Sequence, residues 1–215
     1  MNISQTKQEL INFLRNQDVL TTTVRGVTTF EDTGTFDSDE THTVANSPTN
    51  LKNIRSVTRG TLLVYGKDYT INFVTGVISF TSAQTGAYTI SYDAGSRDSI
   101  YPDFPRDDLD ISSYPRIAID VINGSSDVFG IGGSQFISNF SVTIVVYDDN
   151  QNDIESYIDL IRTDFVNNAS NFYYFNFIKP IGTGPMISSP DRSNEIMQRN
   201  IDYQIIMEVE TKSWI

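Results

Sequence analysis

The stretch "NFSVTIVVYDDNQNDIESYIDLIRTDF", Asn139 to Phe165, carries a strand pattern that runs directly into a helix pattern. Its first part is rich in Val and Ile and ends in two acidic residues, which is typical of a strand that closes in a turn. Asn152 and Glu155 have the spacing of a capping box, so we expect the helix to begin there. Apolar side chains then recur on one helix face, at Ile154, Tyr157, Ile158, Ile161 and Phe165. A helix of this kind must cover a sheet.

Strand patterns lie on both sides of this helix. "RIAIDVI" from Arg116 predicts the strand before "NFSVTIVVYD", and the glycine-bearing "NGSSDVFGIGG" is expected to connect the two. After the helix, "NFYYFNFI" predicts an apolar strand and "NIDYQIIMEVE" predicts a final, alternating strand. Between these two, "KPIGTGPMISSPDRSNEIMQR" is expected to form a long loop, of a kind that is often functional or becomes ordered at an interface.

The chain opens with a second helix pattern, from Ser4 to Arg15. Ser4 is the expected N-cap, and Leu10, Ile11 and Leu14 make a narrow apolar stripe. Because a helix of about 12 residues is marginal by itself, we expect it to pack with the sheet of the C-terminal half.

Residues 22–98 have a β texture throughout. "TLLVY", "YTINF", "GVISF" and "AYTISY" predict four short strands of an antiparallel meander, separated by "GKD", "VT" and "SAQTG". One buried face is expected to collect Tyr69, Ile71, Phe73, Ile78, Phe80, Tyr88, Ile90 and Tyr92. The preceding polar and acidic stretch, Glu31 to Asn50, is expected to hold a long hairpin loop.

Together these patterns predict an α+β fold, in which an antiparallel sheet is covered by one or two helices and an all-β module, sandwich-like or barrel-like, is inserted. Residues 1–21 and 99–215 are assigned to the α+β domain, and residues 22–98 to the inserted module. The stretch from Asp93 to Pro115 carries three prolines and little periodicity, so we expect a linker that crosses a surface.

Composition excludes several classes of function. A formal net charge of −12 and a pI of about 4.3 argue against a protein that grips nucleic-acid phosphates. The chain has no cysteine and a single histidine, His42, in a polar stretch that predicts an exposed loop. We therefore expect no catalytic residues, no metal site and no cofactor, and no enzymatic activity. The first residues contain no long apolar run, so we expect neither a signal peptide nor a membrane span.

Four acidic residues near the start of the β texture are a candidate calcium site. Asp32, Asp37, Asp39 and Glu40 are numerous enough to bind Ca²⁺, but their spacing is not that of an EF-hand loop. We interpret them as a solvated acidic loop.

The pattern from Pro115 to Glu210 resembles the tail terminator, or tail completion, proteins of long-tailed bacterial and archaeal viruses. The resemblance rests on "YPRIAIDVI", on "SNFSVTIVVYD" running into "NDIESYIDLIRTDF", and on the closing "NIDYQIIMEVE". Separately, "YGKDYTINFVTGVISF" resembles a hairpin common in virion tail and neck proteins, where it packs against neighbours. The β module departs from the compact members of the family, and it would decorate the outside of a ring.

The resemblance implies a structural virion protein of the neck, assembled in the host cytoplasm. It implies a homo-oligomer, a hexameric ring, that caps the tail tube protein and offers a surface to the head-side connector protein. Genome DNA would pass through the channel without specific binding. Such a ring needs head-to-tail interfaces that close, made by strand edges and long loops. The candidate interface elements are the linker, residues 100–114, and the loop, residues 182–199, with the residues Tyr101, Phe104, Met186, Ile187 and Arg192.

Alternatives remain open. These interface side chains would instead contact their own domain. Within virions, a head-tail connector or stopper, or another neck or baseplate protein, is the nearest alternative. Outside that class, residues 22–98 would form a carbohydrate-binding or receptor-binding module, or a pair of acids would make a hydrolase.

Overall fold

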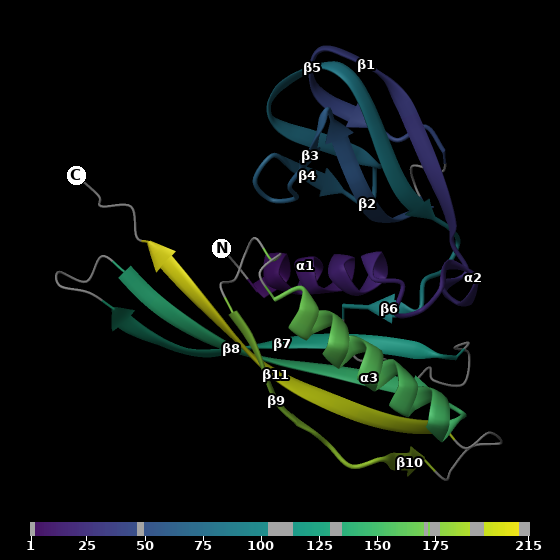
Figure 1. Ribbon diagram of the computed structural model, residues 1–215, viewed down its shortest axis with the longest axis vertical. Coiled ribbons are helices and arrows are strands. Elements are labelled where there is room, and N and C mark those ends of the chain that lie inside the picture. The colour runs from purple at the N-terminus through teal and green to yellow at the C-terminus, as the bar shows by residue number, and fades with distance from the viewer. Residues whose placement is uncertain are drawn as a thin grey trace. The chain divides into compact units, whose positions relative to one another are not determined.

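The computed structural model describes residues 3–46, 50–102, 114–129, 135–169, 172, 177–189 and 196–210. Strands dominate it, helices are few, and the strands form two sheets (Figure 1). The chain divides into two compact units. We call Arg15–Ser99 the β unit, and Met1–Leu14 together with Ile100–Ile215 the helix-sheet unit.

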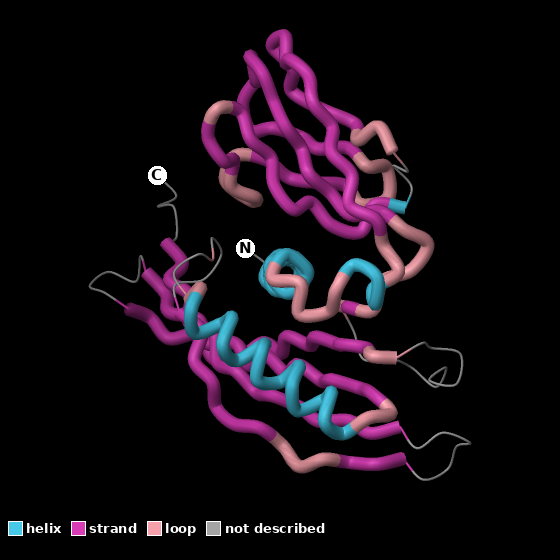
Figure 2. The backbone as a smooth tube through the Cα atoms, turned by 45° about the vertical axis from the view of Figure 1, so that its right-hand side comes forward, coloured by secondary structure: helices cyan, strands magenta, loops and turns pink. Residues whose placement is uncertain are grey.

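The β unit contains a five-stranded sheet in the order β1-β5-β2-β3, with β4 also paired to β5. Its strands are β1 (Thr28–Thr43), β2 (Leu51–Arg59), β3 (Thr61–Leu63), β4 (Tyr69–Asn72) and β5 (Val77–Ala94). The pairs whose register is described are antiparallel, and Figure 2 shows the long strands bending so that the sheet curls on itself. A short helix, α2 (Thr22–Arg25), precedes β1 and ends at Gly26, whose left-handed φ of 72° suits glycine.

Three expectations for this sheet are wrong. The short strands do not form the predicted meander, because β3 pairs with β2 and β4 pairs with β5. Most of Glu31–Asn50 is no hairpin loop, because β1 runs to Thr43 as an edge strand along β5, with two register shifts near Asp39. "GVISF" and "AYTISY" are not separate strands either, since "TSAQTG" continues the extended backbone within β5. Small and polar residues there mimic a turn signal, but Gln84, Thr85 and Gly86 pair with β1, which keeps them extended. The residues before Gln84 lie in a register shift of this pair.

The predicted buried face is confirmed. Tyr69, Ile78, Phe80, Ile90 and Tyr92 are buried in one apolar cluster, with Ile71, Phe73 and Tyr88 packed partly buried against it. The turn before β5 is tight, because the side chain of Asn72 accepts hydrogen bonds from the backbone N–H of Val74 and Thr75. Gly76 closes this turn with a φ of 70°.

The helix-sheet unit contains a six-stranded sheet in the order β10-β11-β8-β7-β6, with β9 also paired to β11. Its strands are β6 (Ile100–Tyr101), β7 (Arg116–Phe129), β8 (Gln135–Asp148), β9 (Phe177–Thr183), β10 (Ile187–Ser189) and β11 (Ile196–Glu210). The sheet is antiparallel as predicted, except that β6 pairs with β7 in parallel.

One helix, α3 (Gln151–Asn167), lies across this sheet and contacts β8 and β11 (Figure 1). The predicted apolar face is confirmed for its four buried members, Ile154, Ile158, Ile161 and Phe165. The N-cap is Asn150, whose side chain accepts a hydrogen bond from the backbone N–H of Asn152, so the predicted start was two residues late.

Two connections in this unit differ from prediction. The expected long loop, residues 179–199, contains most of β9, all of β10 and the start of β11, because its Pro- and Gly-rich pieces pair with β11 as edge segments. "NGSSDVF" continues β7 instead of leaving it, with a register shift between Asn123 and Ser126. There a Cβ on Gly124 would lie 1.8 Å from the carbonyl oxygen of Asn139, so glycine is required for the close approach.

The first helix, α1 (Ile3–Asn16), is confirmed, although Ser4 lies within it instead of capping it. Leu10, Ile11 and Leu14 are fully buried, and the ring of Phe13 stacks on that of Phe165 at a centroid distance of 5.0 Å. In the part of the chain that the structure describes, no helix combines the length and the apolar character needed to cross a membrane.

Candidate interaction surface

The six-stranded sheet has two different faces. Tyr203 of β11 contacts Phe165 of α3, at a ring distance of 5.0 Å, and therefore marks the helix face. Because side chains alternate along a strand, the neighbours of Tyr203 point to the other face. Strand register assigns this second face, which we call the distal face, Arg116, Ala118, Asp120, Ile122, Ser141, Thr143, Val145, Tyr147, Gln198, Asn200, Asp202 and Gln204.

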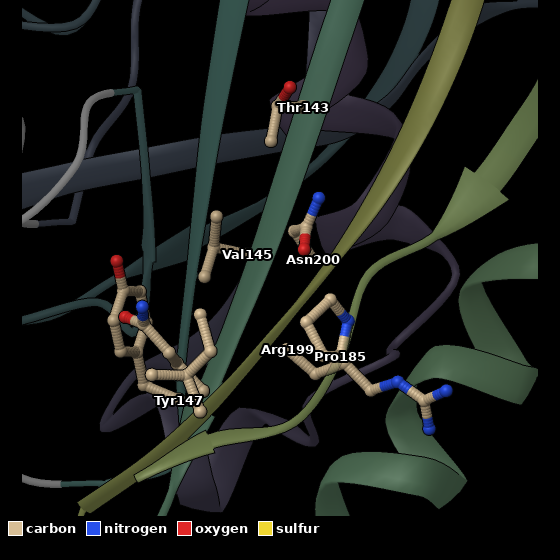
Figure 3. Close-up of a pocket in the computed structure, with 8 residues that line it drawn as sticks. Thr143, Val145, Tyr147, Pro185, Arg199 and Asn200 are labelled. Carbon is tan, nitrogen blue, oxygen red and sulfur yellow. The ribbon is translucent and has the colours of Figure 1, made fainter. Parts of the chain in front are cut away.

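A pocket of about 330 Å³ lies where β8, β11 and the β9–β10 segment meet (Figure 3). Its walls are formed by Thr143, Val145, Tyr147, Pro185, Ile187, Gln198, Arg199 and Asn200. Gly184 allows the chain to pass close to β11, because a Cβ there would lie 1.9 Å from the Asn200 side-chain oxygen. The backbone N–H of Gly184 donates to the carbonyl of Asn200 at 2.9 Å, which fixes this approach.

Most charged and polar side chains of this pocket already form hydrogen bonds or ion pairs within the protein. Arg199 turns toward α3, where it pairs with Glu155, and its Nε donates to the Gly184 carbonyl at 2.9 Å (Figure 3). Thr143 and Asn200 both donate to the carboxylate of Asp202, at 2.8 and 3.0 Å. The pocket thus presents apolar and amide surface, which suits contact with a side chain or backbone better than reaction chemistry.

The predicted interface residues fall into two groups. Phe104 and Arg192 lie outside the described residues. Tyr101 of β6 pairs with Ala118 of β7 and therefore lies on the distal face. The guanidinium carbon of Arg116 lies 4.0 Å from the ring centroid of Tyr101. Ile187 stands opposite Gln198 on the same face, in the pocket wall, and is 49% exposed.

Met186, the remaining predicted interface residue, precedes Ile187 and is partly buried. Structure therefore brings Tyr101 and Ile187 to one face of one sheet, from strands at its opposite sides. Their part in an interface stays a prediction.

Sequence reasoning missed the exposed apolar side chains near the edges of this sheet. Phe177 on β9 is 47% exposed, Ile181 on β9 is 62% exposed, and Ile122 on β7 is 55% exposed. "NFYYFNFI" was predicted as an apolar strand, and residues 171 and 173–176 of it lie outside the described residues. Strict alternation would have placed Phe177 on the face opposite the buried Ile178. Ile181 is exposed because it is the extra residue of a register shift opposite Asp202 and Tyr203.

Sequence reasoning also missed a buried ion-pair network in the β unit. Arg25 is fully buried and donates to Asp98 through Nε and Nη2, at 3.1 and 3.0 Å, and to Asp93 through Nη1 at 2.9 Å. Arg55 donates to Asp93 at 2.6 Å and to both oxygens of Asp18. The network joins the segment before β1 to the end of β5, residues that are about 70 positions apart in the chain.

Burial and pairing act in opposite directions on these groups. Burial alone would raise the pKa of Asp93, but hydrogen bonds from Arg55 and Thr29 and the charge of Arg25 lower this pKa below its usual value. Burial would likewise lower the pKa of Arg25, and its two carboxylate partners raise it instead. The pattern is that of a satisfied structural network, in which each charge is compensated.

His42 does not lie in an exposed loop as predicted. It belongs to β1, its side chain is 17% exposed, and its Nε2 lies 3.5 Å from the carboxylate of Asp32. Asp32 is itself buried and accepts hydrogen bonds from the Tyr92 hydroxyl, at 3.0 Å, and from the backbone N–H of Ala45, at 2.7 Å. The expected acidic loop is therefore a strand, and Asp32 holds the chain that leaves it.

Within the described ranges, no three His, Asp or Glu side chains gather closely enough to bind a metal ion. No family model matches the sequence, and no curated protein matches it significantly. The strongest candidate for a functional site is a surface, formed by the distal face and the two edges of the six-stranded sheet, because exposed apolar side chains lie there.

Proposed function

We propose that this chain is a structural subunit of a tailed virus, a tail terminator that forms a closed ring on the tail tube and joins it to the head-side neck. The observation that carries the proposal is the architecture of the helix-sheet unit. Its strands β7 and β8, its helix α3 and its final strand β11 occur in the order of the resemblance and form one sheet with α3 on one face. The fold we propose is accordingly α+β, with the β unit as an inserted module.

The edges of this sheet favour self-association. At one side β9 pairs only with β11, and at the other β7 pairs only with β8 beyond Ala118, among the residues described. Two open edges on opposite sides of one sheet permit head-to-tail contacts, in which every copy uses both edges. Head-to-tail contacts form a closed ring when the rotation from one copy to the next divides a full turn evenly.

The long strands give further support. Residues 123–129 of β7, 135–139 of β8 and 207–210 of β11 continue as a three-stranded ribbon past the end of α3 (Figure 1). A ribbon that leaves its own core offers contact area to a neighbour. The net charge of −12 fits a channel through which DNA slides without being held.

The test is the mass of the purified chain by light scattering, followed by negative-stain images of the same fraction and by addition of rings to polymerising tail tube protein. We expect six-fold rings that stop tube growth. Rings that leave tube growth unchanged and bind the head-side connector would favour a connector or stopper. A monomer that fails to associate with tube protein, but binds glycans, would overturn the proposal.

A further inference from the structure

Resting on the proposed ring, we propose that two copies of this chain join by pairing β9 of one copy with β7 of the next in a single antiparallel register, in which Phe177 faces Ile122 and Lys179 faces Asp120. The six-stranded sheet would then continue from copy to copy.

Strand direction fits this pairing. β9 is antiparallel to β11, β11 to β8, and β8 to β7, so β9 and β7 run in opposite directions within one copy. If a second copy is placed beside the first with its sheet in the same orientation, its β7 lies antiparallel to the first copy's β9. Antiparallel addition of a strand to an open edge is a common mode of protein association.

Side-chain faces select the register. Phe177 and Lys179 stand opposite Ile206 and Gln204 of β11, and therefore lie on the distal face. On β7, Ile122 and Asp120 stand opposite Ser141 and Thr143, which also belong to the distal face. A register of Phe177 with Ile122 keeps both distal faces together, whereas a shift by one residue would place distal side chains against the helix face.

The same register matches the buried face. Ile178 of β9 would stand opposite Val121 of β7, and each is 5% exposed in its own copy, on the helix face. The apolar layer under α3 would therefore continue across the junction without a polar group between the copies.

Exposure and charge agree with this register. Phe177 and Ile122 are 47% and 55% exposed, and cross-strand apolar contact would remove both from water. Lys179 is exposed, and the side chain of Asp120 is 31% exposed although its Oδ1 lies 3.2 Å from Nζ of Lys7. In a chain of net charge −12, a contact that places a lysine of one copy against an aspartate of the next avoids like-charge repulsion.

Disulfide trapping tests the register directly, because the chain contains no cysteine. In the double variant Phe177→Cys/Ile122→Cys, opposed positions would have Cα atoms about 4.5–5.5 Å apart, within disulfide reach. Within one copy the two positions are three strands apart, about 14 Å, so any disulfide joins different copies. The matched control is Ile187→Cys/Ile122→Cys, since Ile187 is exposed to the same extent but lies outside the register.

We expect the double variant to give a ladder of covalent oligomers on oxidation, while the control stays at least about tenfold less crosslinked. Rings by imaging without a ladder would overturn the inference and leave the proposed function standing, and another protein's strand would then be sought for the β9 edge. Covalent dimers without rings would support the pairing and overturn the ring. Absence of both rings and crosslinks would overturn both.

A charge variant gives a second readout. Lys179→Glu places an acid against Asp120 of the neighbouring copy, and we expect self-association to weaken about five- to tenfold at low salt. Lys67→Glu, a matched change of an exposed lysine in the β unit, should leave association unchanged. Equal effects of the two variants would show that net charge, not the β9 edge, controls assembly, and would overturn the inference.

Discussion

Asp148 places a buried carboxyl at the junction of β8 and α3, and replacing it with asparagine should stabilise the protein above pH 6. The side chain is 5% exposed, and its Oδ1 accepts hydrogen bonds from the backbone N–H of Asp149, at 2.7 Å, and of Asn150, at 3.3 Å. Burial, together with the neighbouring carboxyl of Asp149, raises the pKa of Asp148 from 3.8 to about 6. The folded state therefore holds this proton more tightly than the unfolded chain does.

The direction and size of this stabilisation follow from the linkage between protonation of Asp148 and folding. A carboxyl whose pKa is raised on folding stabilises the folded state in its protonated form. Below about pH 4 Asp148 is protonated in both states, so it does not lower the free energy of unfolding. The cost grows between pH 4 and 6 and is complete above pH 6. A pKa raised from 3.8 to about 6 corresponds to about 3 kcal/mol of folding free energy. Asparagine keeps an oxygen for both backbone donors and carries no charge, so Asp148→Asn should recover about 1–3 kcal/mol at pH 7.5.

The assay is urea unfolding followed by circular dichroism at pH 4 and at pH 7.5, at one fixed protein concentration. The variant should be more stable than the parent at pH 7.5 and nearly equal to it at pH 4. Asp153→Asn, an exposed acid in the first turn of α3, is the control and should show no such pH-dependent gain. A gain of the same size at both pH values, or a loss at pH 7.5, would show that the charge of Asp148 does not destabilise the folded state.

Other predictions concern the β unit and the long strands. Arg25→Met removes the arginine that Asp93 and Asp98 share, while Arg55 still pairs with Asp93 and Arg15 with Asp98, so the β unit should lose about 2–3 kcal/mol in urea unfolding. Arg59→Met should cost under about 1 kcal/mol. Because pairing lowers the pKa of Asp93, the contribution of this carboxylate is present at neutral pH and is lost in acid, which a thermal-unfolding series between pH 7 and pH 3 would show as a falling midpoint. Gly124→Ala should cost about 1–3 kcal/mol and speed amide exchange in the ribbon, while Gly182→Ala, whose Cβ would meet nothing within 4 Å, should be tolerated.

Much of the fold follows from local pattern. The two long helices, the apolar face of α3, the buried face that begins at Tyr69 and the antiparallel β7–β8 pair were all predicted, because amphipathic periods of 3.6 and 2 leave a direct trace in sequence. Strand lengths were predicted poorly. Thr-, Ser- and Gly-rich pieces inside β1, β5 and β7 resemble turns, and only pairing with a neighbouring strand keeps them extended.

The candidate interaction surface could be predicted from the sequence only in part. Ile187 and Tyr101 were chosen as apolar residues in predicted non-strand segments, and the structure puts them in strands on one shared face. The alternation of Phe177 with Ile178 was present in the sequence, but its meaning required the knowledge that β9 lies at an edge. Whether the side chains of an edge strand are exposed or buried depends on whether another strand lies beside it, and the alternation alone does not show this.

Local pattern and composition are enough to predict a β-rich, acidic chain without cysteine, with one strongly amphipathic helix that needs a sheet to cover. The folded chain is needed to see that Arg25 meets Asp93 and Asp98, that Asp148 is buried, and that Phe177 and Ile122 are exposed on opposite edges of one sheet. This difference arises because periodicity is a property of neighbouring residues, whereas burial, charge pairing and edge position depend on strands that come together from distant parts of the chain.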